Sequence, residues 1–92
     1  YQLLNAQQLA PGHAGDVTMV LCTLQPGCSS SGKMVSHLYT EVCFVIAGRI
    51  RALRAGGEEL LGPGDTIRVT PGVLHDFYNV GDAPAVVLAV TF

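Results

Sequence analysis

Two stretches decide the fold of this 92-residue chain: GKMVSHLYTEVCFVIAG at residues 32–48 and GDTIRVTPGVLHDFYN at residues 64–79. Each starts at a glycine and runs into apolar and β-branched residues, which favour strands. Gly and Pro stand at the ends of the apolar runs, where they predict sharp turns. The two stretches therefore predict strands joined by tight turns.

The same pattern continues on both sides of these stretches. Short apolar runs bounded by turn residues predict strands at 17–24, 35–47, 49–54, 60–61, 66–69, 75–80 and 85–92. The run 2–9 has two interpretations, a helix ended by Pro11 and Gly12 or an edge strand. Many short strands separated by Gly and Pro turns are typical of an all-β sandwich or barrel.

The length of the chain predicts a single domain over residues 1–92, with a core at about 16–92 and an N-terminal strand or arm at 1–15. Hydrophobic residues make up 49% of the chain and charged residues 13%. A domain of this size can hide only a limited fraction of its surface. We therefore expect part of the apolar surface to form a subunit interface.

Charge and cysteine content restrict the partners and the location. A net charge of −2 with five Lys and Arg residues predicts no nucleic-acid partner. No run of about 18 apolar residues is present, so we expect no membrane partner. Cys22, Cys28 and Cys43 are odd in number and form no C-x-x-C pair. They predict free thiols and a cytoplasmic, reducing environment.

The first stretch carries a candidate binding face. Strand side chains alternate between the two faces of a sheet, so a strand through Glu41 places every second residue on one face. The residues that would share this face are His37, Tyr39, Glu41, Cys43 and Val45. A carboxylate in an apolar strand is costly to bury without a partner, and an imidazole is a suitable one.

The second stretch repeats this arrangement, because His75, Phe77 and Asn79 share one face of the strand predicted at 75–80. Two imidazoles and one carboxylate directed into the same barrel would suit a divalent ion such as Fe, Mn, Ni, Zn or Cu. His37, Glu41 and His75 are therefore candidate metal ligands. Asn79 is expected to satisfy backbone groups at the end of its strand.

Residues 32–48 resemble the first motif of the cupin superfamily, in which a Gly leads to His-x-His, then Glu, then Gly. Residues 64–79 resemble the second motif, which runs Gly, Pro-x-Gly, His, Asn. The resemblance covers about residues 16–92 and is closest to small, single-domain, RmlC-like cupins of the conserved-barrel type. It implies a double-stranded β-helix, a jelly-roll barrel, and a homodimer.

Two positions depart from the family pattern. Val35 stands where the family usually has the first of two histidines. Thr70 stands where the second motif has its proline, two residues before Gly72. The ligand set that the resemblance implies, three His and one Glu, is thereby reduced to His37, Glu41 and His75. Tyr39 is a candidate fourth ligand or proton donor.

These residues support several functions. One is a metal-dependent dioxygenase, isomerase or lyase that acts on a small polar molecule, with Tyr39, Cys43 and Phe77 as candidate substrate-binding residues. For Cys43 and Phe77 the alternative is an inert place in the core. The second function is a non-enzymatic, metal-free module that binds a sugar or small metabolite, and the third is a structural protein with an occluded barrel.

Overall fold

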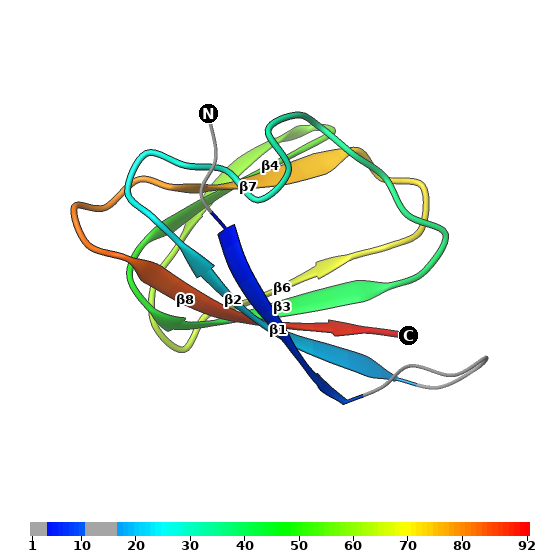
Figure 1. Cartoon of the computed structure of the whole chain (residues 1–92). Helices are drawn as coiled ribbons and strands as arrows, with labels where there is room; N and C mark the ends of the chain where they lie inside the picture. The colour runs from blue at the N-terminus through cyan, green and yellow to red at the C-terminus, as the bar shows by residue number, and fades with distance from the viewer. Residues whose placement is uncertain (1–3, 11–16) are drawn as a thin grey trace.

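A computed structural model describes residues 4–10 and 17–92, and of residues 4–10 it describes the backbone. Strands are the only regular secondary structure among the described residues, and they form two antiparallel sheets that face each other (Figure 1). The strands are β1 (Leu4–Ala10), β2 (Thr18–Leu24), β3 (Glu41–Ala47), β4 (Ile50–Arg54), β5 (Gly57–Leu61), β6 (Thr66–Val69), β7 (His75–Asn79) and β8 (Ala85–Thr91). The all-β prediction is thus confirmed. No helix in this part of the chain is long and apolar enough to cross a bilayer.

The larger sheet has the order β1-β2-β8-β3-β6, and the smaller has the order β5-β4-β7. In Figure 1 the smaller sheet lies across from the larger one, with β4 and β7 facing β2, β3 and β8. Strand β1 is at one edge of the larger sheet, so the edge-strand interpretation of residues 2–9 is confirmed for the part described. Pro11, Gly12 and His13 lie outside the described residues.

The core fills the space between the two sheets. Along β3, Cys43 and Val45 are buried, whereas Phe44 and Ile46 face outward and are 40% and 45% exposed. Strand β8 buries every second residue in the same way, and from the smaller sheet Ile50, Ala52 and Phe77 complete the cluster. Period-two alternation along each strand therefore decides which residues reach the interior.

One end of the barrel is tightly closed. Gly48 has φ = +89°, which favours glycine, and a Cβ at this position would lie 2.7 Å from the Cα of Ala85. Asn79 donates from Nδ2 to the carbonyls of Leu24 and Ala83, at 2.9 and 2.8 Å. Its Oδ1 accepts from the Gly81 N–H at 2.8 Å, so the prediction that Asn79 satisfies backbone groups is confirmed.

The structure corrects two predicted strand limits. The strand predicted at 35–47 begins at Glu41, and residues 36–40 carry no strand. Val35 makes only an isolated antiparallel bridge to His75. The strand predicted at 60–61 extends over Gly57–Leu61, because these residues pair with β4 along their whole length.

Candidate metal centre

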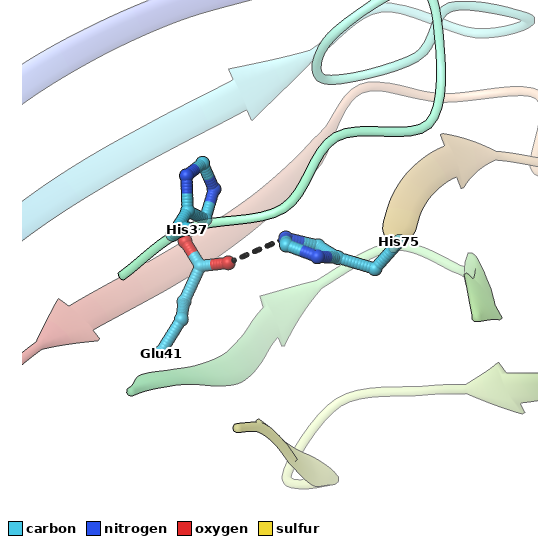
Figure 2. A group of neighbouring side chains, drawn as sticks. All are labelled: His37, Glu41 and His75. Atoms are coloured by element: carbon cyan, nitrogen blue, oxygen red, sulfur yellow. Dashed lines mark hydrogen bonds and ion pairs between the residues drawn. The ribbon is translucent and has the colours of Figure 1, made fainter. Parts of the chain in front are cut away.

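Three side chains from separate parts of the fold converge at the end of the barrel opposite Gly48. His37 lies in the irregular segment before β3, Glu41 is the first residue of β3, and His75 is the first residue of β7. Their nearest ligand atoms all lie within 4.8 Å of one another. Figure 2 shows the Glu41 carboxylate near both imidazole rings. The three candidate ligands are therefore brought together.

His75 is held rigidly. Its side chain is almost fully buried, and its backbone exchanges two hydrogen bonds with Val35, at 2.8 and 2.9 Å. The ring Nδ1 lies 2.9 Å from the carbonyl oxygen of Val73. A carbonyl can only accept, so Nδ1 must carry the proton of this hydrogen bond. This contact fixes the ring orientation and directs Nε2 toward Glu41.

The second ring nitrogen of His75 lies 3.2 Å from Oε1 of Glu41. With Nδ1 protonated, a neutral ring presents a lone pair at Nε2, and an ionised carboxylate presents lone pairs as well. Two lone pairs at this distance repel each other unless a positive charge sits between or beside them. A proton carried by either residue, or a metal ion, removes this repulsion. A histidine that gives its other N–H to a carbonyl is the usual arrangement for a metal ligand.

His37 is held less firmly. Its backbone carbonyl accepts a hydrogen bond from the Gly72 N–H at 2.8 Å. Its ring stacks on Tyr39, with centroids 4.7 Å apart and planes 6° apart, and meets the ring of His75 edge-on at 5.0 Å. Two backbone hydrogen bonds between Thr40 and Phe92 hold the end of this segment. Ring contacts thus position the imidazole, and its nitrogens stay available to bind.

The route by which His37 reaches the site differs from the prediction. Alternation along one strand was expected to place His37 on the same face as Glu41, but no strand contains both residues. The hydrogen bonds between Thr40 and Phe92 end the β3–β8 ladder, and the segment before them leaves it, since the His37 carbonyl accepts from the Gly72 N–H. The face prediction was wrong about the backbone, although the two side chains do meet.

The donor set fits a divalent ion. Two imidazoles and one carboxylate suit Fe(II), Mn, Ni, Zn or Cu. The Glu41 side chain is 16% exposed and the His37 side chain is half-buried, so the group is reachable from outside. Val35 offers no ligand atom from its side chain. Three protein ligands leave positions for water or substrate, as in catalytic metal sites.

A cavity of about 330 Å³ extends from these ligands into the barrel. Tyr39, Cys43 and Phe77, the predicted substrate-binding residues, all line it, together with His37 and Glu41. Its volume is at the lower end of the range of about 300–1,000 Å³ that is typical of small-molecule sites. The barrel is therefore not occluded, in contrast to the third function considered from the sequence.

The negative charge of Glu41 and the apolar walls keep nearby groups neutral. Burial raises the pKa of Tyr39, and the Glu41 carboxylate raises it further. The pKa values of the Cys22 and Cys43 thiols are raised by burial first and by Glu41 second, with a further contribution from Cys22 at Cys43. These thiols and the phenol are therefore protonated at neutral pH, and Cys43 lines the wall as a small uncharged side chain.

The sequence analysis missed one wall of the cavity. Thr18, Val20 and Cys22 of β2 line it, as does Thr91 of β8. The alternation along 18–24 carries the signal, since its even-numbered residues share one face. The sequence analysis also missed the hydrogen bonds that hold Ser30, which lines the cavity. Buried Asp76 accepts hydrogen bonds from the Ser30 hydroxyl at 3.0 Å and the Ser31 N–H at 3.3 Å.

Comparison with known proteins matches the profile of the Cupin domain family to residues 20–91. A Cupin 2 conserved barrel domain protein from Salinispora arenicola is 27% identical, with a TM-score of 0.82 over 97% of this chain and 75% of that one. A sugar phosphate isomerase of the cupin superfamily from Silicibacter pomeroyi is 31% identical, with a TM-score of 0.77 over 94% of this chain and 58% of that one.

A predicted oxalate decarboxylase from Thermotoga maritima is 20% identical, with a TM-score of 0.88 over 97% of this chain and 79% of that one. At this identity the likeness concerns the fold alone. No protein of curated function matches the chain. The solved structures are double-stranded β-helix barrels, so the jelly-roll prediction is confirmed.

Proposed function

The chain belongs to the Cupin domain family, and we propose that it is a metal-binding barrel in which His37, Glu41 and His75 hold one divalent ion. Fe, Mn, Ni, Zn and Cu all accept such a donor set. The proposed role is to bind or transform a small molecule that enters the adjoining cavity. Tyr39, Cys43 and Phe77 are the proposed substrate-binding residues.

The observation that carries this proposal is the orientation of His75. Its Nδ1 is committed to Val73, and its Nε2 faces the Glu41 carboxylate at 3.2 Å. This arrangement requires a proton or a metal ion between the two atoms, and His37 adds a third donor within 4.8 Å. A bound divalent ion would satisfy all three residues at once.

A metal at this position would polarise a carbonyl or hydroxyl oxygen of the substrate. The chain's own residues have separate tasks. Tyr39 keeps its proton, because burial and Glu41 raise its pKa, so its hydroxyl is available as a hydrogen-bond donor. Cys43 and Phe77 line the cavity and give its wall an apolar surface. If the protein is an enzyme, a dioxygenase, isomerase or lyase reaction is compatible with this equipment.

A metal-free ligand-binding barrel is the second candidate, and one observation favours it. A distance of 3.2 Å between Nε2 and Oε1 also suits a hydrogen bond from a protonated imidazole to a carboxylate. In that case the second proton on His75 supplies the positive charge. The cavity would then bind a sugar or metabolite without metal chemistry.

Titration of chelator-treated protein with Zn²⁺ and Mn²⁺ by calorimetry separates the two candidates. We expect about one ion bound per chain, and His75→Ala should weaken binding by about 100-fold or more, since it removes a ligand. His13→Ala is the matched histidine control. Glu41→Gln removes the carboxylate ligand and should also weaken binding. Glu58→Gln is its matched control, because Glu58 is exposed and pairs with Arg51.

Absence of binding in the wild-type protein, or equal affinity in His75→Ala and His13→Ala, would contradict the metal proposal. Stabilisation of the chelator-treated protein by a sugar or metabolite would then favour the second candidate. A thermal-shift screen run with chelator present detects this stabilisation, because ligand binding to the folded state raises the melting temperature.

We also propose a homodimer formed through the outer face of the larger sheet. Leu21, Leu88 and Phe44 lie in register across β2, β8 and β3 on that face. A sheet that is apolar on both faces favours burial of both. A second copy is the proposed occupant, in agreement with the apolar composition of the chain.

Light scattering tests this interface. The expected mass is twice that of the 9.7 kDa chain, and Phe44→Glu should reduce it to the single-chain mass. Leu60→Glu is the control, because Leu60 is 62% exposed on the smaller sheet. A wild-type monomer at micromolar concentration would contradict the dimer.

The free thiols of Cys22, Cys28 and Cys43 support a proposed location in the reducing cytoplasm.

A further inference from the structure

Residues of the cavity wall form three rows across β2, β8 and β3. The outermost row is polar: Thr18 pairs with Thr91, and Thr91 pairs with Glu41. This row adjoins the candidate metal ligands. Going deeper, the wall loses its charged group and becomes largely apolar.

The next row contains Val20, Ala89 and Cys43, and the one after it contains Cys22, Val87 and Val45. The smaller sheet closes the opposite side with Ile50, Leu61 and Phe77, and the uncharged Ser30 and Ser31 also line the cavity. The cavity thus has a polar mouth and a deep, uncharged, mainly apolar body.

No lysine or arginine lines the cavity, and the whole chain contains only five. All five belong to the described residues, and none comes from residues 1–3 or 11–16. Lys33, Arg49, Arg51 and Arg68 are exposed. Arg54 is opposite His75 in the β4–β7 ladder, but its guanidinium donates to the Arg68 carbonyl and pairs with Glu59. No lysine or arginine side chain is therefore available to bind an anionic group in the deep part of the barrel.

From this arrangement we infer that the cavity takes a neutral small molecule. One end of this molecule carries an oxygen atom that can bind a metal ion, and the rest of it is apolar. The oxygen lies at the polar mouth beside Glu41 and His37, and the body lies among Val20, Val45, Val87 and Phe77. An anionic group in the deep part would lose its hydration without gaining a cationic partner, which is strongly unfavourable. The inference rests on the proposed function, since the metal ligands form the polar end. It refines the small polar molecule expected from the sequence.

The size of the cavity limits the ligand. At about 330 Å³ it is at the lower end of the range of small-molecule sites. A single ring with a short side chain fits this volume. We therefore choose 4-phenylbutan-2-one as the neutral probe and 3-phenylpropanoate as its charged twin. The two have the same number of non-hydrogen atoms. The ketone has a methyl group where the carboxylate has its second oxygen.

Binding of both probes is measured by calorimetry on the 92-residue chain, as purified without chelator and after chelator treatment. In treated protein no ion can bind the probe's carboxylate, which would lie at the mouth beside the like-charged Glu41, so the ketone should bind at least about tenfold more tightly. The ketone should also bind the protein as purified. Equal or tighter binding of the carboxylate in treated protein overturns the inference, as does failure of the ketone to bind either form.

Two matched substitutions locate the apolar body. Ala89→Leu fills the middle row and should weaken ketone binding by about tenfold or more. Val90→Leu adds bulk at the next residue of β8, which faces away from the cavity, and should change it by less than about twofold. Val20→Phe fills the same row from β2 and replaces Ala89→Leu if that variant does not fold. Unchanged affinity in a folded cavity-filling variant overturns the inference.

The Zn²⁺ titration keeps this inference separate from the proposed function. If the ion binds but the ketone does not, the substrate class is wrong and the metal proposal stands. If the ketone binds with the expected selectivity but no ion binds, the metal proposal is wrong and the neutral substrate class stands.

Discussion

The two ends of the barrel use similar residue types in opposite ways. At the closed end, Asn79 is buried and makes three hydrogen bonds to backbone groups, and Gly48 packs directly against Ala85. At the open end, Nε2 of His75 and Oε1 of Glu41 face each other at 3.2 Å, an arrangement that a proton or the proposed metal ion would satisfy. The polar side chain at the first end has all its partners within the fold. The second end presents donor atoms to the cavity, which is where departures from local rules are expected in a functional site.

Substitutions at the closed end should therefore affect stability most, and substitutions at the open end should affect binding most. The largest expected effect is that of Gly48→Ala. A Cβ there meets the Cα of Ala85 at 2.7 Å, and φ is +89°. Overpacking and left-handed strain together should lower the free energy of unfolding by about 3–5 kcal/mol.

The control for Gly48→Ala is Gly64→Ala. Gly64 has the same φ of +89°, but a Cβ there would meet nothing within 4 Å. Strain alone should cost about 1 kcal/mol, measured by urea unfolding of both variants. Equal losses in the two variants would show that close contact at the closed end contributes nothing beyond the backbone conformation.

Asn79→Ala should have the next largest effect. The substitution leaves the Leu24 and Ala83 carbonyls and the Gly81 N–H without their side-chain partner. We expect a loss of about 2–4 kcal/mol in the free energy of unfolding. Asp65→Ala removes a single exposed hydrogen bond, to the Gly62 N–H, and should cost about 1 kcal/mol or less. A loss in Asn79→Ala no greater than that in Asp65→Ala would contradict the account of the closed end.

Removal of metal should affect the open end alone. A ligand present at 100 times its dissociation constant stabilises the folded state by about 2.7 kcal/mol. Chelator should therefore lower the melting temperature of the wild-type protein, and calorimetric scans measure this change. In Glu41→Gln the chelator should have little effect, because the carboxylate ligand is gone. An equal effect of chelator on the melting temperatures of both proteins would show that the metal binds at another site.

His37→Ala should have the smallest effect on stability. The ring is half-buried, lies on an irregular segment and contacts the rings of Tyr39 and His75. In metal-free protein we expect a loss of about 0.5 kcal/mol or less, measured by urea unfolding. Metal affinity should nonetheless fall, since a ligand is lost. A large loss of stability with unchanged metal affinity would make His37 a structural residue instead.

The same two regions explain how much could be predicted from the sequence. Alternation along 75–79 correctly placed His75, Phe77 and Asn79 on one buried face, because these residues form a regular strand with ladder partners. Glycine and proline positions correctly predicted the turns, including Gly48. Local rules suffice where regular pairing determines which face each side chain takes.

The segment containing His37 could not be predicted in the same way. Its path depends on Gly72 and Phe92, which are distant in sequence, and on the bridge between Val35 and His75. Such contacts override strand propensity, and no local period records them. The resemblance to cupins identified His37 as a ligand candidate, whereas the alternation argument reached the same residue from an incorrect backbone.

The most direct test of the central claim is the metal content of the chain purified without chelator, measured by plasma mass spectrometry against protein concentration. The account predicts about one Fe, Mn, Ni, Zn or Cu ion per wild-type chain, and a content near background in His75→Ala protein that is still folded. A wild-type content near background, or the same content in His75→Ala as in wild type, would contradict it.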